Sequence, residues 1–339
     1  MAASTVTKSK KRSYFNVSKL GVVFSVLLII VIVAYYFIRP QQATAVYAST
    51  LRQSTPLILG ALCGLIGERS GIINIGIEGQ MLMAAFIAFL VNVYMGNLFV
   101  AVVAGVAIGA FIGLFLAWMS ITLKMDQIIG GTIINILALG LTSFFYIAGL
   151  TTQGKLQPIP LGPLANIPLI GPVLFNNAPI TYLTIILVFV MQFMLFRTVW
   201  GLRTRAVGEH PSAADTVGIR VNVTRYLNTT FAGCFAGLAG AYLTLEAVGS
   251  FERGMTNGRG FIALAVMIFG KWTPLGAWGG ALLFGAASAL QTQFQFLGLD
   301  FIPHQFIGMF PYVLTIVVLA GFVGRSRPPA AEGKVYDPE

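Results

Sequence analysis

Charged residues are scarce in this sequence, and their scarcity excludes a water-soluble domain. Only 9% of the 339 residues are charged, whereas 57% are hydrophobic and the mean hydropathy is +0.84. This composition is typical of a chain that crosses a lipid bilayer several times. The net charge of +10 would suggest a nucleic-acid partner for a soluble protein. Here the basic residues gather in the two tails and one loop, as they do on the cytoplasmic side of membrane proteins, so we expect no nucleic acid.

Residues that usually build metal sites and disulfides are also few. The two cysteines, Cys63 and Cys234, fall within predicted helices, so we expect small apolar side chains there and no disulfide. His210 and His304 have no cysteine or carboxylate constellation around them that resembles a metal site. The sequence also lacks a Walker phosphate loop, a nucleophile elbow and a dinucleotide fingerprint. We therefore expect no metal, no bound cofactor and no catalytic residue.

Long uncharged runs predict an all-α polytopic membrane protein with about ten transmembrane helices. The hydrocarbon core of a bilayer takes about 20 apolar residues per helix. The first predicted span is expected to stay uncleaved, because it is long for a signal peptide and no clear small-residue cleavage site follows it. A proline-rich loop at 150–177 is expected to be irregular and extracellular. The predicted spans are residues 20–38, 54–67, 81–94, 98–123, 128–148, 180–196, 226–247, 261–270, 275–295 and 306–323.

The distribution of lysine and arginine predicts that both termini are cytoplasmic. Ten crossings place both tails and the basic loop on one side of the membrane, where most basic residues then lie, in agreement with the positive-inside rule. Residues 54–148 and 226–323 then hold four spans each in opposite orientation, which suggests two inverted four-helix halves. The expected parts are a cytoplasmic tail at 1–19, a transmembrane domain at 20–323 that includes a cytoplasmic loop at 197–225, and a second tail at 324–339.

Residues 67–80, GERSGIINIGIEGQ, interrupt a hydrophobic run with four glycines and several polar side chains. Charged side chains at membrane depth cost about 2.5 to 3.5 kcal/mol each on insertion scales, so we expect Glu68, Arg69 and Glu78 to be paired, to line a wet cavity or to lie at the interface. Two interpretations stay open. The segment is either a polar turn at the cytoplasmic surface or a broken helix that lines a transport path.

The basic loop at 201–225, GLRTRAVGEHPSAADTVGIRVNVTR, predicts one compact cytoplasmic helix. Pro211 suits the first position of a helix, and Gly218 suits its end. The alternative is an ordinary positively charged loop that only fixes topology.

Polar residues within the predicted spans are candidates for contact with a solute, because a solute needs fixed hydrogen-bond partners in an otherwise apolar wall. For each of them the alternative is a side chain satisfied by a neighbouring helix. Gly233, Gly237 and Gly240 are expected to allow close helix packing. Together with two residues of the 67–80 segment, the candidates for the path are Asn74, Glu78, Gln127, Thr132, Asn135, Asn228, Thr230, Glu246 and Gln291.

Three sequence blocks show a resemblance to a known family. They are GERSGIINIGIEGQMLM (67–83), RAVGEHPSAADTVGI (205–219) and GRGFIALAVMIFGKWTPLGA (258–277). The sequence resembles the permease subunits of ABC importers, in the simple-sugar and nucleoside branch, over almost the whole stretch from about 54 to 321. The segment DQIIGGTIINILALGLTSF (126–144) looks most like the nucleoside-type members.

The resemblance implies that the helix after Pro211 is a coupling helix, which docks on a separate ATPase subunit that binds the ATP. Small side chains at Ala213, Ala214 and Gly218 would allow close approach. Bulky substitutions at Gly208 or Ala214 are expected to leave the chain folded, because the loop lies outside the hydrocarbon core, while the ATPase dissociates or hydrolyses ATP without transport. The implied coupling residues are Arg205, Gly208, Glu209, Pro211, Ala213, Ala214, Asp215 and Gly218.

The resemblance also implies a second permease subunit, often non-identical, an extracellular solute-binding protein and a location in the plasma membrane. We expect an uncharged, hydroxyl-bearing nucleoside as the solute. The alternatives are a permease for ribose-like sugars or branched-chain amino acids, or an ion-coupled secondary transporter with Glu78 and Glu246 as the plausible carriers. A non-transporting scaffold or receptor is disfavoured, because a static anchor needs neither ten spans nor glycine-rich breaks.

Overall fold

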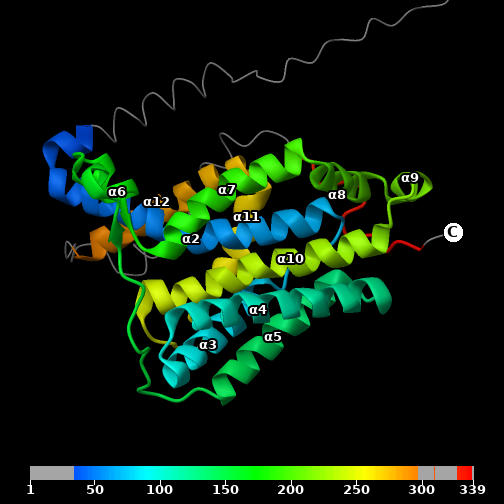
Figure 1. Cartoon of the computed structure of the whole chain (residues 1–339), viewed down its shortest axis with the longest axis horizontal. Coiled ribbons are helices and arrows are strands. Elements are labelled where there is room, and N and C mark those ends of the chain that lie inside the picture. The colour runs from blue at the N-terminus through cyan, green and yellow to red at the C-terminus, as the bar shows by residue number, and fades with distance from the viewer. Residues whose placement is uncertain (1–33, 297–308, 310–326, 338–339) are drawn as a thin grey trace, which may run out of the picture. The chain divides into compact units, whose positions relative to one another are not determined.

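The computed structural model describes residues 34–296, 309 and 327–337, and these residues are mainly helical (Figure 1). The predicted spans at 20–38 and 306–323 lie mostly outside the described residues. The chain divides into two compact units, residues 1–43 and 44–339. The sites described below lie in the second unit.

Helices account for nearly all of the regular structure in the described residues, and the one strand pair consists of β1 and β2, which run antiparallel with Ile159 opposite Asn177. Two of the helices continue into short π-helical segments, η1 after α4 and η3 after α10. In chain order the elements are α2 (Pro40–Arg69), α3 (Ile77–Met95), α4 (Leu98–Ala117), η1 (Trp118–Thr122), α5 (Gln127–Phe144), β1 (Ile159–Pro160), the 3-10 helix η2 (Gly162–Asn166), α6 (Ile170–Leu174), β2 (Asn176–Asn177), α7 (Pro179–Arg197), α8 (Val199–Glu209), α9 (Pro211–Thr216), α10 (Val221–Ala241), η3 (Tyr242–Val248), α11 (Arg259–Phe269) and α12 (Pro274–Phe296).

Five segments among the described residues are long and apolar enough to cross a membrane. They are Ile77–Met95, Leu98–Thr122, Gln127–Phe144, Pro179–Arg197 and Val221–Val248. Each agrees with a predicted span to within a few residues at either end. These segments fit an all-α protein that passes through the membrane several times, whereas the count of ten spans and the inverted halves stay predictions.

Two predictions from the sequence need correction. The predicted span at 54–67 belongs to a helix that begins much earlier, since α2 runs over 30 residues from Pro40 to Arg69. Its first half is rich in polar residues, so hydropathy alone does not identify it. The proline-rich loop at 150–177 is also more regular than expected, because it contains η2, α6 and the strand pair. The Tyr182 hydroxyl stabilises this loop by accepting from Asn177 N (3.0 Å) and donating to Ile159 O (3.0 Å).

The helices α10 and α4 pack backbone against backbone. A Cβ atom added at Gly237 would lie 2.4 Å from the carbonyl oxygen of Gly105, and one added at Gly109 would lie 2.4 Å from that of Gly233. A Cβ at Gly240 would meet the carbonyl oxygen of Met81 in α3 at 2.3 Å. The prediction of close packing at the three glycines of α10 is therefore confirmed, and glycine is the residue that allows such an approach.

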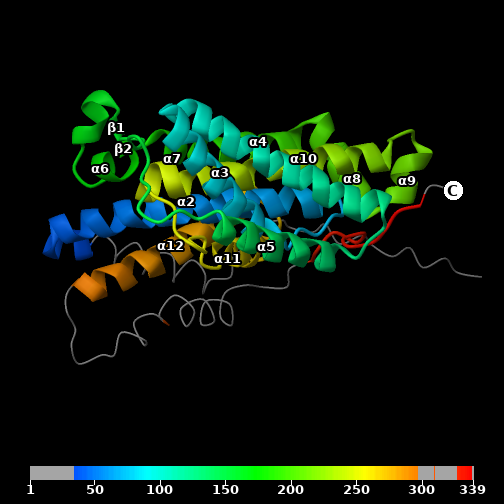
Figure 2. The same ribbon diagram turned by 90° about the horizontal axis from the view of Figure 1, so that it is seen from below.

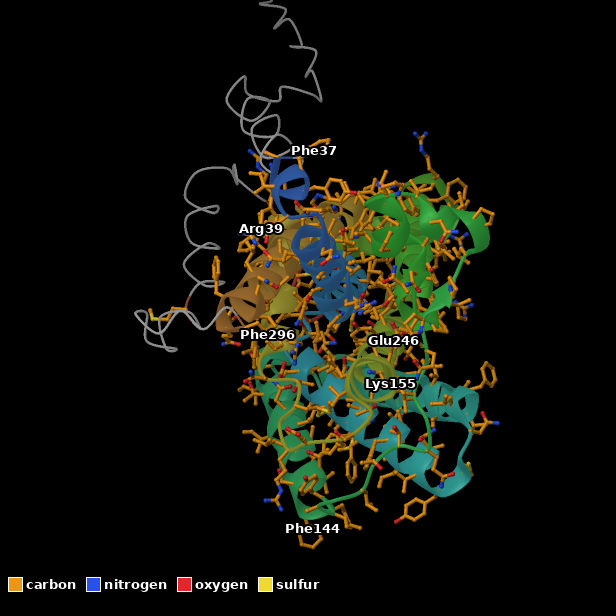
Figure 3. All side chains as sticks on the ribbon, turned by 90° about the vertical axis from the view of Figure 1, so that its left-hand side faces the viewer. Phe37, Arg39, Phe144, Lys155, Glu246 and Phe296 are labelled. Atoms are coloured by element: carbon orange, nitrogen blue, oxygen red, sulfur yellow. The ribbon has the colours of Figure 1, made fainter. Side chains whose placement is uncertain are left out.

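The central position of α10 shows in its burial. In an 18-residue apolar stretch of Val221–Val248, 78% of the residues are buried, compared with 28% in the corresponding stretch of Leu98–Thr122. The largest cluster of buried apolar residues joins α10 to α2, α7, α11 and α12. Large apolar side chains also project from the periphery, as Phe144 does at the end of α5 with 81% of its surface exposed (Figure 3). An exposed apolar periphery around a packed interior is what a lipid environment favours.

Candidate functional site

Residues 70–76 interrupt the helical structure between α2 and α3, as predicted, and are called the break below. Helix α5 supplies hydrogen-bond partners for this region. Gly71 adopts a φ of +92°, which is open to glycine and strained for other residues. The Gln127 side-chain oxygen accepts from Ile73 N (2.7 Å). Asn135 accepts from Gly79 N (2.7 Å) and donates to Ile75 O (3.0 Å). The two α5 side chains thus satisfy backbone groups that the break leaves without helical partners.

The two charged residues at the end of α2 both contact Trp272, in the turn before α12. The Trp272 indole donates to Glu68 Oε2 (2.5 Å), and Arg69 donates twice to the carbonyl oxygen of Trp272 (3.0 and 2.8 Å). Asn74 donates to the side-chain oxygen of Gln80 (3.0 Å) within the same buried region. These polar side chains therefore hold the break in place.

Glu78 joins the beginning of α3 to the beginning of α11. Its two carboxylate oxygens accept from Gly258 N (2.8 Å) and Gly260 N (2.6 Å). The backbones also approach closely here, since a Cβ added at Gly260 would lie 2.5 Å from the Glu78 backbone. A carboxylate that accepts amides at a helix N-terminus is stabilised by the unpaired amides and the helix dipole.

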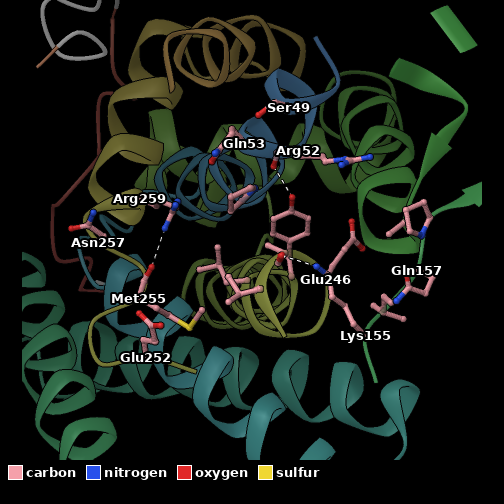
Figure 4. A pocket seen from close by; sticks show the side chains of 18 of the residues that line it. Ser49, Arg52, Gln53, Lys155, Gln157, Glu246, Glu252, Met255, Asn257 and Arg259 are labelled. Carbon is pink, nitrogen blue, oxygen red and sulfur yellow. Dashed lines mark hydrogen bonds between the residues drawn. The ribbon is translucent and has the colours of Figure 1, made fainter. Parts of the chain in front are cut away.

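A cavity of about 900 Å³ lies between α2, η3, the loop after α5 and the segment that leads into α11 (Figure 4). Its size falls within the range of about 300 to 1,000 Å³ for small-molecule sites. Charges of both signs and neutral polar groups share the wall, with four basic residues against two acidic ones, so the cavity offers hydrogen-bond donors and acceptors within a net positive wall. The polar residues in the wall are Ser49, Arg52, Gln53, Lys155, Gln157, Tyr242, Glu246, Glu252, Arg253, Asn257 and Arg259.

Glu246 has a structural role in this wall, because it caps the N-terminus of α7. Its carboxylate accepts from Ile180 N (2.8 Å), Thr181 N (3.2 Å) and the Thr181 hydroxyl (2.5 Å). Lys155 donates to the carbonyl oxygen of the adjacent Ala247 (2.9 Å). These bonds fix the geometry of the cavity on the η3 side, where Figure 4 shows Glu246 and Lys155 in the wall.

Tyr242 compensates for a proline inside α2. Pro56 has no N–H, so the carbonyl oxygen of Arg52, one helical turn earlier, lacks its usual partner. The Tyr242 hydroxyl donates to this oxygen at 2.7 Å. All three residues line the cavity, so this bond connects α2 to η3 at the cavity wall.

Replacing Tyr242 with phenylalanine is expected to lower stability by about 1 kcal/mol, because the Arg52 carbonyl oxygen loses its partner. The loss should be smaller in a Pro56→Ala background, where the alanine N–H restores the helical bond. Thermal unfolding of the two single variants and the double variant in detergent measures the difference. Equal losses in both backgrounds would contradict this account.

Of the nine predicted path residues, only Glu246 lies in the wall of this cavity. Thr132 is exposed on α5 and donates to Ile128 O in its own helix (2.8 Å). Asn228 connects α10 to α8 through the Thr204 hydroxyl (3.1 Å). The Thr230 carbonyl oxygen contacts the Cys234 sulfur at 3.8 Å, and Gln291 is half-buried near the end of α12.

The cavity residues Gln53 and Asn257 were missed by the sequence analysis. Gln53 lies in the polar first half of α2, which was not assigned to a span, and Asn257 lies in the glycine-rich approach to α11. The proline at position 56 was the available signal in this region, because a proline inside a helix leaves a carbonyl oxygen that needs another partner.

At the other end of α10, the short helix predicted after Pro211 is present as α9. It ends at Thr216, and Gly218 beyond it has a φ of +84°. Ala213 is exposed, and Val217 after the helix has 75% of its surface exposed. Both residues therefore lie on the open surface of this region, although a single exposed apolar side chain does not by itself mark a contact surface.

Two of the small residues assigned to this surface face the protein interior instead. Ala214 is 3% exposed and packs with Val207 and Val221. A Cβ added at Gly208 would lie 2.2 Å from the carbonyl oxygen of Arg69. The expectation that bulky residues at Gly208 or Ala214 leave the chain folded is therefore wrong, because both sites are filled by the protein's own atoms.

The polar residues assigned to the same surface contact neighbouring segments. Arg205 is half-buried with its guanidinium over the Phe196 ring, 5.2 Å from the ring centre. Glu209 accepts from Ala330 N (3.3 Å), and Asp215 accepts from the Tyr336 hydroxyl (2.8 Å). In the C-terminal segment that these bonds reach, burial raises the pKa of the Glu332 carboxyl above its usual range, which favours its neutral form.

The chain belongs to a family of membrane transport components. Residues 46–319 match the family described as branched-chain amino acid transport system / permease component. Together with the apolar helices, this match identifies a multi-pass membrane permease subunit and not an enzyme.

Curated relatives match nearly the whole chain. It is 40% identical to a guanosine ABC transporter permease protein of Bacillus subtilis, over 87% of this chain and 97% of the relative. It is 38% identical to a nucleoside ABC transporter permease protein of Lactococcus lactis, over 86% and 96%. A putative glucose ABC transporter permease protein of Haloferax volcanii is 36% identical over 84% and 93%. No solved structure matches the chain significantly.

Proposed function

We propose that this chain forms the solute pathway of an ATP-driven importer for nucleosides in the plasma membrane. The observation that carries the proposal is its identity of 40% and 38% to permeases named for guanosine and for nucleosides, in each case over most of both chains. A nucleoside is uncharged and carries several hydroxyl and ring groups. The mixed polar wall of the cavity suits such a solute.

The cavity is proposed as the part of the pathway that receives the solute. Gln53 and Asn257 offer amides for hydrogen bonds to a base or a sugar, and Tyr242 offers an aromatic ring. The predicted path residues Asn74, Gln127 and Asn135 are proposed to act indirectly, because their side chains hold the break between α2 and α3.

The surface around α8 and α9 is proposed to dock on a separate ATPase subunit, with Ala213 and Val217 as exposed contacts. If the import is driven by ATP, as proposed, a separate subunit must bind the ATP, because the sequence of this chain carries no phosphate-binding loop. We further propose ten spans in two inverted halves, cytoplasmic termini, a second permease subunit that is often non-identical in such importers, and an extracellular solute-binding protein that delivers the nucleoside.

Uptake by the importer reconstituted in vesicles tests the solute. Labelled guanosine is expected to enter only with ATP, to be blocked by vanadate and to be unaffected by a protonophore. Glucose is included because of the 36% identity to a putative glucose permease, together with ribose and leucine. Uptake of one of these three without uptake of any nucleoside would reject the nucleoside assignment, and uptake abolished by the protonophore would reject ATP as the driving force.

The same assay tests the cavity. Gln53→Leu removes an amide from the wall and is expected to raise the KM for guanosine about tenfold, as the loss of a hydrogen bond in a binding site does. Thr132→Val is the matched control, since Thr132 is exposed on α5 and donates to its own helix. Equal KM values for the two variants would place the solute elsewhere.

A further inference from the structure

The C-terminal segment 327–337 lies against α8 and α9, where its red trace is seen in both Figure 1 and Figure 2. It has no regular helix or strand, yet Pro329 and Ala331 are buried. A segment without regular structure holds a fixed place through specific contacts, because its backbone groups have no partners of their own.

Two backbone hydrogen bonds hold this segment between α8 and the break. Ala331 N donates to the carbonyl oxygen of Gly208 at the end of α8 (2.9 Å), and Gly333 N donates to that of Gly71 in the break (3.1 Å). The segment thus joins two parts of the chain that are far apart in sequence. A backbone bond at each side fixes its register.

Arg225 of α10 contacts both the break and the C-terminal segment. Its side chain is 2% exposed. It donates from Nε to Ser70 O in the break (3.2 Å) and from Nη1 to Lys334 O in the C-terminal segment (2.9 Å). A buried guanidinium needs such partners, because an unpaired buried charge is costly. Its two acceptors therefore tie the C-terminal segment to the break.

The end of the segment reaches α9 itself. The Tyr336 hydroxyl donates to Asp215 Oδ2 (2.8 Å), and its ring packs on the cluster of Val207, Ala214 and Val221. Asp337 forms an ion pair with Lys124 in the turn before α5. A helix of six residues such as α9 has little stability alone, so its place depends on tertiary contacts of this kind.

We propose that the C-terminal segment positions the coupling helix α9 against the break between α2 and α3, with Tyr336 and Arg225 as the positioning residues. A displacement of α9 is then passed through Tyr336 and the segment backbone to Gly71, next to the segment that Gln127 and Asn135 hold. The inference rests on the proposed docking of α9 on an ATPase. The positioning role is a separate claim from the docking: the ATPase binds with or without the segment, but its motion reaches the break efficiently only when the segment supports the direct contact between Gly208 and Arg69.

The test compares Tyr336→Phe, which removes the hydroxyl and keeps the ring, with deletion of residues 328–339 in the complete importer. Bound ATPase, ATP hydrolysis and guanosine uptake are measured on the same preparations. We expect ATPase binding to be retained. Uptake per ATP hydrolysed should fall about fivefold in Tyr336→Phe, which is within the range for loss of one hydrogen bond, and further in the deletion. Tyr226→Phe is the matched control, since it loses a bond to Thr122 and no contact with the segment.

A structural measurement separates this inference from the proposed function. Spin labels at Ser212 and Val335, both exposed, report the distance between α9 and the segment in the chain without its native cysteines. We expect a narrow distribution that broadens in Tyr336→Phe and not in Tyr226→Phe. If the wild-type chain binds no ATPase, the proposed function fails while this measurement still stands. If Tyr336→Phe keeps both the narrow distribution and the wild-type uptake per ATP, the positioning role is overturned, even where the deletion prevents assembly.

Discussion

Replacing Gly237 with valine is expected to abolish the recovery of folded protein. The new Cβ would lie 2.4 Å from Gly105 O and 2.8 Å from the Val106 Cα, so backbone atoms and not flexible side chains oppose it. Overpacking in a core costs about 1 to 3 kcal/mol and occasionally more. Here the whole of α10 must move away from α4, so we expect the destabilisation to lie at the upper end of this range of costs. Size-exclusion chromatography of detergent-extracted protein measures the loss.

Gly140→Val provides the matched control for this variant. Gly140 lies in the interior of α5, and a Cβ there meets no other atom within 4 Å. The same substitution is therefore expected to leave the yield of folded protein near that of the wild type. A monodisperse Gly237→Val protein would mean that α4 and α10 do not pack as closely as described.

Glu78→Leu is expected to have the second large effect, with loss of transport and a lower melting temperature. The substitution removes the acceptor for Gly258 N and Gly260 N and leaves both without this partner at the beginning of α11. Each buried donor left unpaired costs about 1 to 3 kcal/mol. Thermal unfolding and guanosine uptake, measured on the same preparation, report both consequences.

Glu78→Gln gives an intermediate variant, because one amide oxygen remains to accept a hydrogen bond. We expect a smaller drop in melting temperature than with leucine, and partial uptake. A leucine variant that melts and transports like the wild type would show that Glu78 is dispensable at this junction. A glutamine variant as damaged as leucine would instead point to the charge itself.

The sequence allowed the existence of most helices to be predicted, because hydropathy and glycine or proline breaks act locally. The break after α2 and the helix after Pro211 are both present where their residues indicated. The partners of the polar residues could not be predicted in the same way. Trp272, for example, lies far along the chain from Glu68 and Arg69, and only the fold brings them together.

The polar residues of the spans show the same limit. An amide such as Asn135 satisfies backbone groups of the break, and one such as Gln53 faces a cavity, yet both are amides in helices. The residue type does not distinguish a structural amide from one in a cavity wall, because the role depends on which part of the chain packs next to that amide. Small residues raise a similar problem, since Ala213 is exposed and Ala214 beside it is buried.

The glycine contacts of α10 also bear on how the permease can change conformation. Where two backbones touch, no layer of side chains exists that could switch rotamers and absorb a shear. The contacts at Gly109, Gly237 and Gly240 therefore favour movement of α3, α4 and α10 as one rigid body. Sliding during a transport cycle is then left to interfaces built from flexible side chains, such as that between α7 and α12, where Phe189 meets Trp278 edge to face.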